Sequence, residues 1–387
     1  MRLLVVGHTY MHAFAQGKYV SMKRLDPTLE LKVVTSLAVE HVFMHYRFAR
    51  HPGLCPEEIV ALPIVSGKPP STHVFSPARL WGILREFQPD HIHIEEDPHS
   101  FVGVEMVSLA RFACPGAKIS FFIWDNLAHT PRFPINILKQ MFTQYSLARA
   151  GLVVCGNLEA EKLLRTVKHY AGNTAVIPQL GLDPQDYASP PPDDIRAQLS
   201  MTGAGPLIGF LGRLVPEKGL DILFEALARL QHIPWRLLLV GNGSMEAEIQ
   251  ERWQPLFQER LLRLEAVPHR AVPEYLKCLD IFVLPSLSTP IWKEQFGLTL
   301  AQAMLAGVAC IGSSSGAIPE VIGEGGVVVA EGDVNLLKDI LETLIQSDET
   351  RKSLARKAKV IALQRYTNDT VAQTYLLEFQ KLHGEIL

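Results

Sequence analysis

The chain has 387 residues, of which 48% are hydrophobic and 20% are charged. At about 150 residues per domain, this length predicts two or three domains and excludes a lone small module. The formal charge of −3 lacks the basic excess that is typical of a nucleic-acid-binding protein, so no nucleic-acid partner is expected. The five cysteines are odd in number and far apart, which argues against a disulfide framework or a zinc knuckle and favours a reducing, cytoplasmic location.

The N-terminus, Met-Arg-Leu-Leu-Val-Val-Gly, contains an apolar run that is much shorter than a signal-peptide core. It predicts a first buried strand. No stretch reaches the roughly 18 uncharged apolar residues that a spanning helix needs, so we expect a soluble protein that is at most peripheral to a membrane.

The first half of the chain alternates short apolar runs with amphipathic stretches. One of these stretches, residues 76–87, begins with Ser76 and Pro77, a helix cap followed by proline in the first turn. Alternation of this kind predicts a parallel sheet with helices on both faces. The predicted strands are 3–6, 31–34, 59–64, 91–94, 119–124, 152–154 and 175–177.

A proline-rich segment divides the chain. Residues 184–205 contain four prolines and several acidic residues at their start, a composition that favours a linker over a helix or strand. A second alternating series follows, with strands predicted at 207–211, 236–240, 261–264, 281–284, 308–311 and 327–329. The sequence therefore predicts an α/β protein with two doubly wound, Rossmann-like domains, 1–183 and 206–363.

From residue 333 onward the pattern is helical. A last amphipathic helix is predicted at 364–387 and is expected to pack back on the N-terminal domain. Open α/β sheets bind ligands at the carboxyl ends of their strands. We therefore expect the two domains to face each other across a cleft that contains the active site.

The first informative turn follows the predicted strand 207–211. Arg213 and Lys218 flank the start of the next helix, so two cations and free backbone amides converge on one place. This arrangement is typical of a phosphate or diphosphate site. The alternative is a solvated loop with two surface cations.

A second turn of this kind leads into the predicted helix 298–306. Backbone amides near Gly297 can hold an anion, and Glu294 just before them can accept hydrogen bonds from hydroxyl groups. On spacing alone, a helix cap is the better explanation of Glu294, and the presence of two anion-accepting turns in one domain favours the functional one.

These two turns belong to a series of motifs, spread over residues 207–330, that resembles the donor domain of family 4 glycosyltransferases, of the type called glycosyl transferases group 1. The resemblance implies the two-Rossmann GT-B fold, a nucleoside-diphosphate-sugar donor on the C-terminal domain and an acceptor on the N-terminal domain. It also implies retention of the anomeric configuration and no required metal. The motifs are Gly212-Arg213, Lys218-Gly219, Gly241-Asn242-Gly243, Asp280-Ile-Phe-Val-Leu-Pro285-Ser286, Glu294-Gln-Phe296-Gly297-Leu298, Ala303-Met304, Ala306-Gly307 and Gly316-Ala-Ile-Pro319-Glu320-Val321.

The resemblance also implies roles for single residues. Arg213 and Lys218 match the pair that neutralises the donor diphosphate, and Glu294 matches the first acid of the family's two-acid motif, which holds the donor sugar. These three are the expected catalytic residues. The second acid falls on Gln302, an amide that can still bond ribose hydroxyls. The remaining donor-binding positions are Gly212, Val267, Phe296, Gly297 and Leu298.

The N-terminal half departs from the family at the end of the predicted strand 119–124. Many relatives have a histidine there, whereas this chain has Trp124, followed by Asp125 and Asn126. Asp125 and Asn126 are candidates for the acceptor side because they sit at a strand end. His129 is an alternative candidate, although a histidine on a loop is more often a surface residue.

Other acceptor-side candidates are Gly7 and His8, which follow the first strand, and Glu95, which with Glu96 and Asp97 follows the strand 91–94. His91, His93 and Glu95 alternate along that strand and so share one face, which resembles a metal site. The absence of an Asp-x-Asp motif makes metal the weaker interpretation, and no metal or cofactor is expected besides the nucleotide-sugar co-substrate.

Residues 129–150 are predicted to form a helix with an apolar stripe. The stripe is explained either by a core-facing helix, which the net charge favours, or by contact with a membrane surface, as in some relatives that use lipid-linked acceptors.

The function expected from these features is a metal-independent, retaining transfer of a hexose from a nucleoside-diphosphate sugar to a hydroxyl acceptor. The acceptor is a glycan, glycolipid or small molecule in polysaccharide biosynthesis or a related pathway. Cytoplasmic location, with peripheral contact at the inner face of the membrane, fits this reading. Two alternatives remain open: a catalytically inactive nucleotide-sugar-binding protein, and an epimerase or phosphorylase on the same fold.

Overall fold

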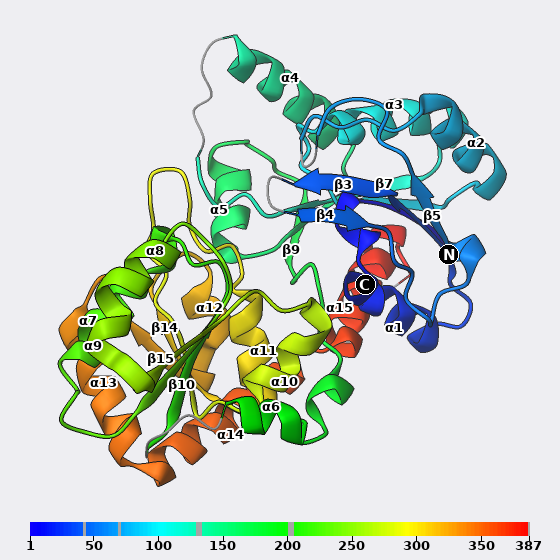
Figure 1. Ribbon diagram of the computed structural model, residues 1–387. Coiled ribbons are helices and arrows are strands. Elements are labelled where there is room, and N and C mark those ends of the chain that lie inside the picture. The colour runs from blue at the N-terminus through cyan, green and yellow to red at the C-terminus, as the bar shows by residue number, and fades with distance from the viewer. Residues whose placement is uncertain (42–43, 69–70, 129–133, 200–204, 386–387) are drawn as a thin grey trace. The chain divides into compact units, whose positions relative to one another are not determined.

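The computed structural model describes residues 1–41, 44–68, 71–128, 134–199 and 205–385. The chain divides into two compact units, and many of their helices and strands are labelled in Figure 1. The first unit consists of Met1–Gly181 together with Asn368–Leu387, and the second consists of Leu182–Thr367.

The first unit is built on a seven-stranded parallel sheet in the order β5-β2-β1-β6-β7-β8-β9. Each strand lies within one or two residues of its predicted bounds, because buried parallel strands are nearly continuous apolar runs. A short antiparallel hairpin, β3 (Ala38–His41) and β4 (Met44–Arg47), was missed, since four residues are too few to show a period. The sheet strands are β1 (Arg2–Val6), β2 (Glu30–Ser36), β5 (Ile59–Leu62), β6 (His91–Ile94), β7 (Lys118–Ile123), β8 (Leu152–Cys155) and β9 (Asn173–Val176).

Helices cover both faces of this sheet. On one face Leu4 and Ile92 pack in a core with helices α2 and α3, and on the other Leu3 and Val5 pack with α1 and α15. Figure 1 shows α15, drawn in red, beside α1 in blue, and the two helices are in contact. The helices of this unit are α1 (Gly17–Leu25), α2 (Pro77–Phe87), α3 (Phe101–Ala113), α4 (Ile135–Leu147), α5 (Leu158–Thr166) and α15 (Asn368–His383).

The chain leaves the second unit after Thr367 and returns to the first unit at Asn368. Helix α14 stops at Arg365, and α15 starts at Asn368 instead of residue 364. Val371, Tyr375 and Phe379 of α15 are buried in the first unit, as their spacing predicted. Tyr366 was wrongly assigned to the same helix: it precedes α15, and its ring packs on Phe296 of the second unit.

The second unit is built on a six-stranded parallel sheet in the order β12-β11-β10-β13-β14-β15. Its strands match the predicted ones closely. They are β10 (Leu207–Leu211), β11 (Arg236–Val240), β12 (Leu261–Leu264), β13 (Ile281–Leu284), β14 (Ala309–Ser313) and β15 (Gly326–Val329). The helices are α6 (Asp193–Gln198), α7 (Leu220–Ala228), α8 (Glu246–Glu248), α9 (Gln254–Phe257), α10 (Val272–Leu276), α11 (Leu298–Ala306), α12 (Ile318–Ile322), α13 (Val334–Gln346) and α14 (Asp348–Arg365).

The segment predicted as a linker, residues 184–205, lies in the second unit and contains regular structure. Pro184–Tyr187 form a 3-10 turn, which the Asp183 side chain caps, and Asp193–Gln198 form α6. No helix was predicted in this segment, and α6 begins directly after its proline run, so that no proline lies inside the helix. Pro192 stands at the N-cap of α6, where a helix does not need the missing N–H.

Helix α4 is shorter and more exposed than predicted. Its second half buries Ser146 and Leu147, but its first half exposes Ile137, Leu138 and Met141 to solvent. The core-facing interpretation was therefore wrong for the first half, because an apolar stripe does not show whether a neighbouring element covers it. None of the helices in the described part of the chain is long and apolar enough to cross a bilayer.

Each sheet has one place where successive connections run in opposite directions. In the first unit this switch lies between β1 and β6, and in the second between β10 and β13. The carboxyl ends of strands at such a switch point are where doubly wound sheets bind ligands.

Candidate functional site

The switch point of the second unit is shaped by the turn after β10. Pro216–Lys218 form a 3-10 turn, and Gly219 then takes a left-handed conformation, with φ of +68°, before α7 begins. A Cβ at residue 219 would lie 2.0 Å from the carbonyl oxygen of Pro285, which follows β13. Only glycine fits, and the turn thereby brings Lys218 to the end of β13.

Lys218 meets Glu294 at this place. The Lys218 Nζ lies 2.6 Å from the Glu294 Oε2, which also accepts a hydrogen bond of 3.0 Å from the Ser286 hydroxyl. The Trp292 ring lies 4.8 Å from the same Nζ. The side chains of Lys218 and Glu294 are only 13% and 10% exposed, so their charges interact with little screening by water.

The N-terminus of α11 lies three residues beyond Glu294 in the chain. Gly297 forms its cap with φ of +77° and, being a glycine, has no side chain that could bond this end. The first amides of a helix have no acceptor inside the helix, and the helix dipole favours an anion there. The backbone at Phe296, Gly297 and Leu298 can therefore hold a phosphate, as predicted from the resemblance.

Three other predicted donor residues lie at neighbouring strand ends. Arg213 follows β10 and is 62% exposed, with its Nη2 3.6 Å from the Glu217 carboxylate. The Gly212 amide donates to the Val240 carbonyl at the end of β11. Val267 lies in the loop after β12, next to Ala266, whose amide donates to the Asn242 side chain at 2.7 Å.

Gln302, expected to face the donor ribose, has a different partner. It lies on the second turn of α11 and is 3% exposed, and its side chain hydrogen-bonds Tyr187, which the sequence placed in a linker. Burial raises the pKa of the Tyr187 hydroxyl above its ordinary range, so this contact is between uncharged groups. The expectation that Gln302 presents its amide to a ligand is corrected accordingly.

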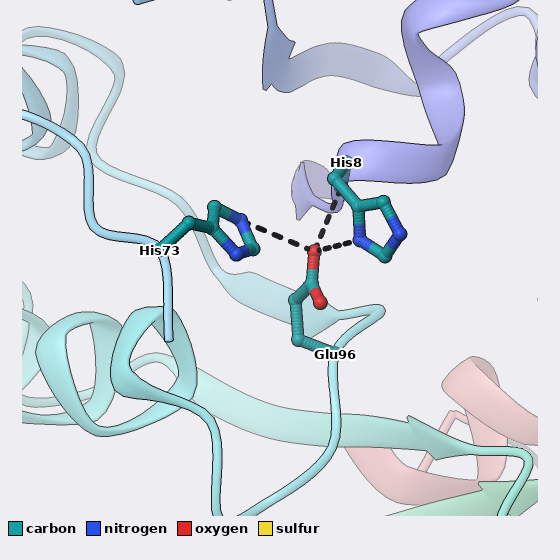
Figure 2. Close-up of side chains that lie close together, drawn as sticks. All are labelled: His8, His73 and Glu96. Carbon is teal, nitrogen blue, oxygen red and sulfur yellow. Dashed lines mark hydrogen bonds and ion pairs between the residues drawn. The ribbon is translucent and has the colours of Figure 1, made fainter. Parts of the chain in front are cut away.

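In the first unit, the turn after β1 meets the turn after β6. The Glu96 Oε1 accepts the backbone N–H of His8 at 2.8 Å and lies 2.7 Å from the His8 Nδ1 (Figure 2). Burial opposes a charge on His8, but the Glu96 carboxylate outweighs burial and raises the pKa of His8. The predicted pair Gly7 and His8 thus lies at the switch point.

His73 joins this group from the loop before α2, as Figure 2 shows. Its Nε2 lies 3.6 Å from the Glu96 Oε1, and its ring is fully buried. Sequence reasoning missed His73 because it follows no predicted strand, so no pattern marked it as a site residue.

Glu95 does not belong to an open site, contrary to expectation. Its Oε1 accepts hydrogen bonds of 2.5 Å from Lys18 and from Tyr19, and all three side chains are buried. Burial opposes the charge on Glu95, but Lys18 beside it holds the pKa of this carboxyl well below its usual range. Glu95 therefore joins β6 to α1 instead of facing an acceptor.

The alternating histidines of β6 are also part of the core. His91 and His93 each place one ring nitrogen 2.7 Å from the Ser120 hydroxyl and pack against Phe379 of α15. The resemblance of His91, His93 and Glu95 to a metal site is explained by these internal contacts. Burial lowers the pKa of both histidines, which keeps them uncharged.

Asp97 and Asp125 follow the neighbouring strands β6 and β7. Burial raises the pKa of Asp97 to about 6, while Lys168 opposes the shift. The Lys168 Nζ also lies 3.8 Å from the Asp125 Oδ2. Asn126, the next residue, is buried. These polar groups gather at one edge of the sheet, which agrees with their prediction at strand ends.

Trp124, at the position where the resemblance implied a histidine, is a packing residue. Its ring N–H donates to Gln179 at 2.9 Å, and its ring packs edge-on against Phe122. A Cβ at Gly156 would lie 2.2 Å from this ring, so the glycine makes room for it. The alternative candidate, His129, lies outside the described residues.

Comparison with known proteins connects these features to a family. Residues 192–360 match the family model described as Glycosyl transferases group 1. D-inositol 3-phosphate glycosyltransferase of Xylanimonas cellulosilytica is 28% identical over 248 residues, which cover 60% of this chain and 57% of that protein. N-acetyl-alpha-D-glucosaminyl L-malate synthase of Bacillus anthracis is 30% identical over 162 residues, or 41% of each chain. This chain spans about half the length of the curated relatives it matches.

Solved structures share the fold over the whole chain. A glycosyltransferase from Rickettsia africae has a TM-score of 0.74 at 16% identity and covers 98% of both chains. Anabaena HepE in complex with UDP has a TM-score of 0.72 at 19% identity, covering 98% of this chain and 100% of that one. The predictions of two Rossmann-like domains and of a resemblance to group 1 glycosyl transferases are confirmed.

Proposed function

We propose that this chain is a retaining glycosyltransferase that moves a hexose from a nucleoside-diphosphate sugar to a hydroxyl acceptor. The observation that carries the proposal is the Lys218–Glu294 pair, which lies at the switch point of the second unit, three residues before the glycine-capped N-terminus of α11. This constellation falls within the segment that matches the family model. Related folds with UDP and with UDP-glucose bound support the same class of donor.

In the proposed reaction, the bond between the anomeric carbon and the donor phosphate breaks while a bond from that carbon to the acceptor oxygen forms on the same face. Negative charge grows on the leaving diphosphate. The Lys218 ammonium and the amides at Gly297 and Leu298 stabilise that charge, with Arg213 at the edge of the site. The departing phosphate oxygen takes the proton of the acceptor hydroxyl.

Glu294 is assigned to the sugar. Its Oε2 is already bonded by Lys218 and Ser286, so the carboxylate is fixed in position before a ligand arrives. A fixed, charged acceptor bonds sugar hydroxyls more strongly than a neutral group does. The role of Glu294 is therefore to orient the hexose so that its anomeric carbon is exposed to the acceptor.

The acceptor is assigned to the first unit, at the edge formed by His8, Glu96, Asp97 and Asp125. Carboxylates and an imidazole can bond the hydroxyls of a glycan, a glycolipid or a small polyol. We include no metal in the handling of the diphosphate, since Lys218 and Arg213 supply the positive charge. Nucleoside diphosphate should accordingly bind the protein with the same affinity in a chelator as in Mg²⁺.

A panel of nucleotide sugars tests this function. The purified protein is incubated with each donor, with and without acceptors of the three classes, and products are identified by mass spectrometry and NMR. The expected result is transfer from one donor with retained configuration. Binding of a donor with neither transfer nor hydrolysis would favour the rival, an inactive nucleotide-sugar-binding protein, which the burial of Gln302 supports. Interconversion of the donor, or its cleavage by phosphate, would favour an epimerase or phosphorylase.

Peripheral membrane contact in the cytoplasm is part of the proposal. Helix α4 exposes Ile135, Ile137, Leu138 and Met141, an apolar surface suited to the headgroup region of a bilayer. The five cysteines are free, as expected in a reducing compartment. Sedimentation with anionic vesicles should fall when Ile137 and Met141 are both replaced by Ser. Equal sedimentation of the variant and the wild type would remove the membrane from the proposal.

A further inference from the structure

Three side chains of the first unit point their ligand atoms at one place. His8 follows β1, Glu96 follows β6, and His73 comes from the loop before α2 (Figure 2). Their ligand atoms all lie within 4.8 Å of one another. Three distant parts of the chain thus bring two imidazoles and one carboxylate together at the switch point of the sheet.

The two buried members of this group, His73 and Glu96, have polar atoms without hydrogen bonds. Neither ring nitrogen of His73 has a hydrogen-bond partner among the described residues, and the same holds for the Glu96 Oε2. Both side chains are buried. Polar groups removed from water are normally bonded, and an unbonded one in a native protein indicates a partner such as an ion.

The histidines of β6 make a useful contrast. His91 and His93 are equally buried, but each has a ring nitrogen 2.7 Å from Ser120. The protein therefore supplies a hydrogen-bond partner to each of the two buried histidines of β6. His73 instead has both nitrogens unbonded beside a carboxylate and a second imidazole.

The chemistry of the three groups selects a class of ion. Imidazole nitrogens and one carboxylate suit Zn²⁺ and similar transition ions, whereas Mg²⁺ and Ca²⁺ prefer sets of oxygen ligands. The His8 side chain is 27% exposed, so water or another ligand can reach a fourth position. Zn²⁺ held by three protein ligands with an open fourth position is a common arrangement.

We infer that His8, His73 and Glu96 form a binding site for one Zn²⁺ ion. The ion would bind the ligand atoms of His8 and Glu96 in place of their mutual hydrogen bond, and it would bind a ring nitrogen of His73. It would tie the loop before α2 to the turns after β1 and β6. This site is separate from the diphosphate turns of the second unit. It shares His8 and Glu96 with the edge to which the acceptor is assigned, so its test measures binding of the metal and of nucleoside diphosphate instead of transfer.

Direct binding measurements test the inference. The full-length protein is stripped with a chelator and titrated with Zn²⁺ by calorimetry, and Co²⁺ is used in parallel to read the ligand field from its visible spectrum. We expect one ion per chain. His73→Asn and Glu96→Gln should each weaken binding at least tenfold and change the Co²⁺ spectrum.

The matched control is His232→Ala. The His232 Nε2 lies 3.6 Å from the Glu342 Oε1, the same distance as in the His73 and Glu96 pair, but within the described part of the chain no third metal-ligating side chain accompanies this pair. This variant should bind Zn²⁺ like the wild type. Glu96→Gln keeps an oxygen that can accept the His8 N–H, so its fold should be preserved, and circular dichroism checks this.

A thermal melt gives a second readout. Zn²⁺ should raise the melting temperature of the wild type and of His232→Ala, but not that of His73→Asn. Wild-type binding no tighter than that of His73→Asn and Glu96→Gln would overturn the inference. The wild type and the three variants should all bind nucleoside diphosphate with equal affinity. Failure of the zinc proposal can therefore be distinguished from failure of the proposed function.

Discussion

Lys218 and Glu294 are 76 residues apart in the chain, yet their charged atoms lie 2.6 Å apart. The contact joins the turn after β10 to the loop after β13, the two strands that flank the switch point of the second sheet. A cation and an anion, both largely shielded from water, thus stand at the position where a doubly wound sheet receives its ligand. The first two predictions separate their roles.

Lys218→Ala should weaken the binding of nucleoside diphosphate by about 1.5–3 kcal/mol, since a charge-assisted contact to the diphosphate is lost. Arg213→Ala should have a smaller effect, because the Arg213 side chain is 62% exposed. Calorimetry with UDP and ADP measures both. Lys352→Ala is the control, since Lys352 forms an exposed pair with Asp348 in the same unit. Equal affinities for Lys218→Ala and the control would remove Lys218 from the diphosphate site.

Glu294→Gln should reduce the rate of transfer by about two orders of magnitude while nucleoside diphosphate still binds, as expected for loss of a contact made in the transition state. Ser286 can still donate to the amide oxygen, so the loop should keep its position. Product formation from the cognate donor is the measurement, and Glu248→Gln, a surface substitution on α8, is the control. Activity near that of the wild type would leave Glu294 with only a structural role.

The contact between Gln302 and Tyr187 predicts a contrast between two substitutions. Gln302→Glu should be tolerated, because the Tyr187 hydroxyl can donate to a carboxylate and because this change restores the family's usual acid. Gln302→Leu should lower the free energy of unfolding by about 1–3 kcal/mol, since it leaves a buried hydroxyl unbonded. Denaturant titration measures the free energy of unfolding of both variants. If Gln302→Leu is as stable as the wild type, the contact contributes nothing.

The buried pair of Lys18 and Glu95 predicts a large effect on stability. Lys18→Met should lower the free energy of unfolding by about 3–5 kcal/mol, because it leaves Glu95 charged and buried without the ammonium group that pairs with it. The double variant with Glu95→Gln should recover part of the loss. Lys381→Met, which removes an exposed pair with Glu378 on α15, is the control. Equal stability of Lys18→Met and this control would show that the pair does not support the fold.

Glu105 predicts how stability changes with pH. Burial raises the pKa of this α3 carboxyl to about 7, above its ordinary value of 4.5, although it accepts the Phe75 N–H at 3.3 Å. The folded protein therefore holds this proton more tightly than the unfolded chain, so stability falls as pH rises from about 4.5 to 7. Glu105→Gln has no carboxyl group at this position, so it should not show this fall in stability as the pH rises. Its melting temperature should exceed that of the wild type more at pH 8 than at pH 5.

The control for this pH experiment is Glu86→Gln, a surface change on α2. It should shift the melting temperature equally at both pH values. A difference between Glu105→Gln and the wild type that does not vary with pH would contradict the prediction.

The sequence predicted the sheets and the donor turns because both are local patterns. A buried strand such as Ile281–Leu284 is one short apolar run, and Gly297 marks the start of α11 through its own backbone freedom. Contacts between distant segments were not predictable in this way. Lys18 reads as a surface residue at a helix start, and only the fold shows that Glu95 and Tyr19 surround it.

The same distinction explains the errors at the candidate sites. Strand-end position predicted that His8, Asp97 and Asp125 lie at the carboxyl edge of the sheet, where the structure has them, but it could not show that the Glu95 side chain is buried against α1. His73 follows no strand, and Tyr187 lies in a proline-rich segment, so neither carried a signal. The role of a residue that contacts a distant part of the chain can be identified only when the structure shows which residues it contacts.

The position of helix α15 at the end of the chain affects how the first unit folds during synthesis. It supplies Tyr375 and Phe379 to the core of the first unit, yet it is encoded after the whole of the second unit. On the ribosome, residues 1–181 emerge long before the helix that covers His91 and His93. The nascent first unit therefore has part of one face of its sheet uncovered, beside α1, while the second unit is made, and a chaperone that shields this part would be most needed during that interval.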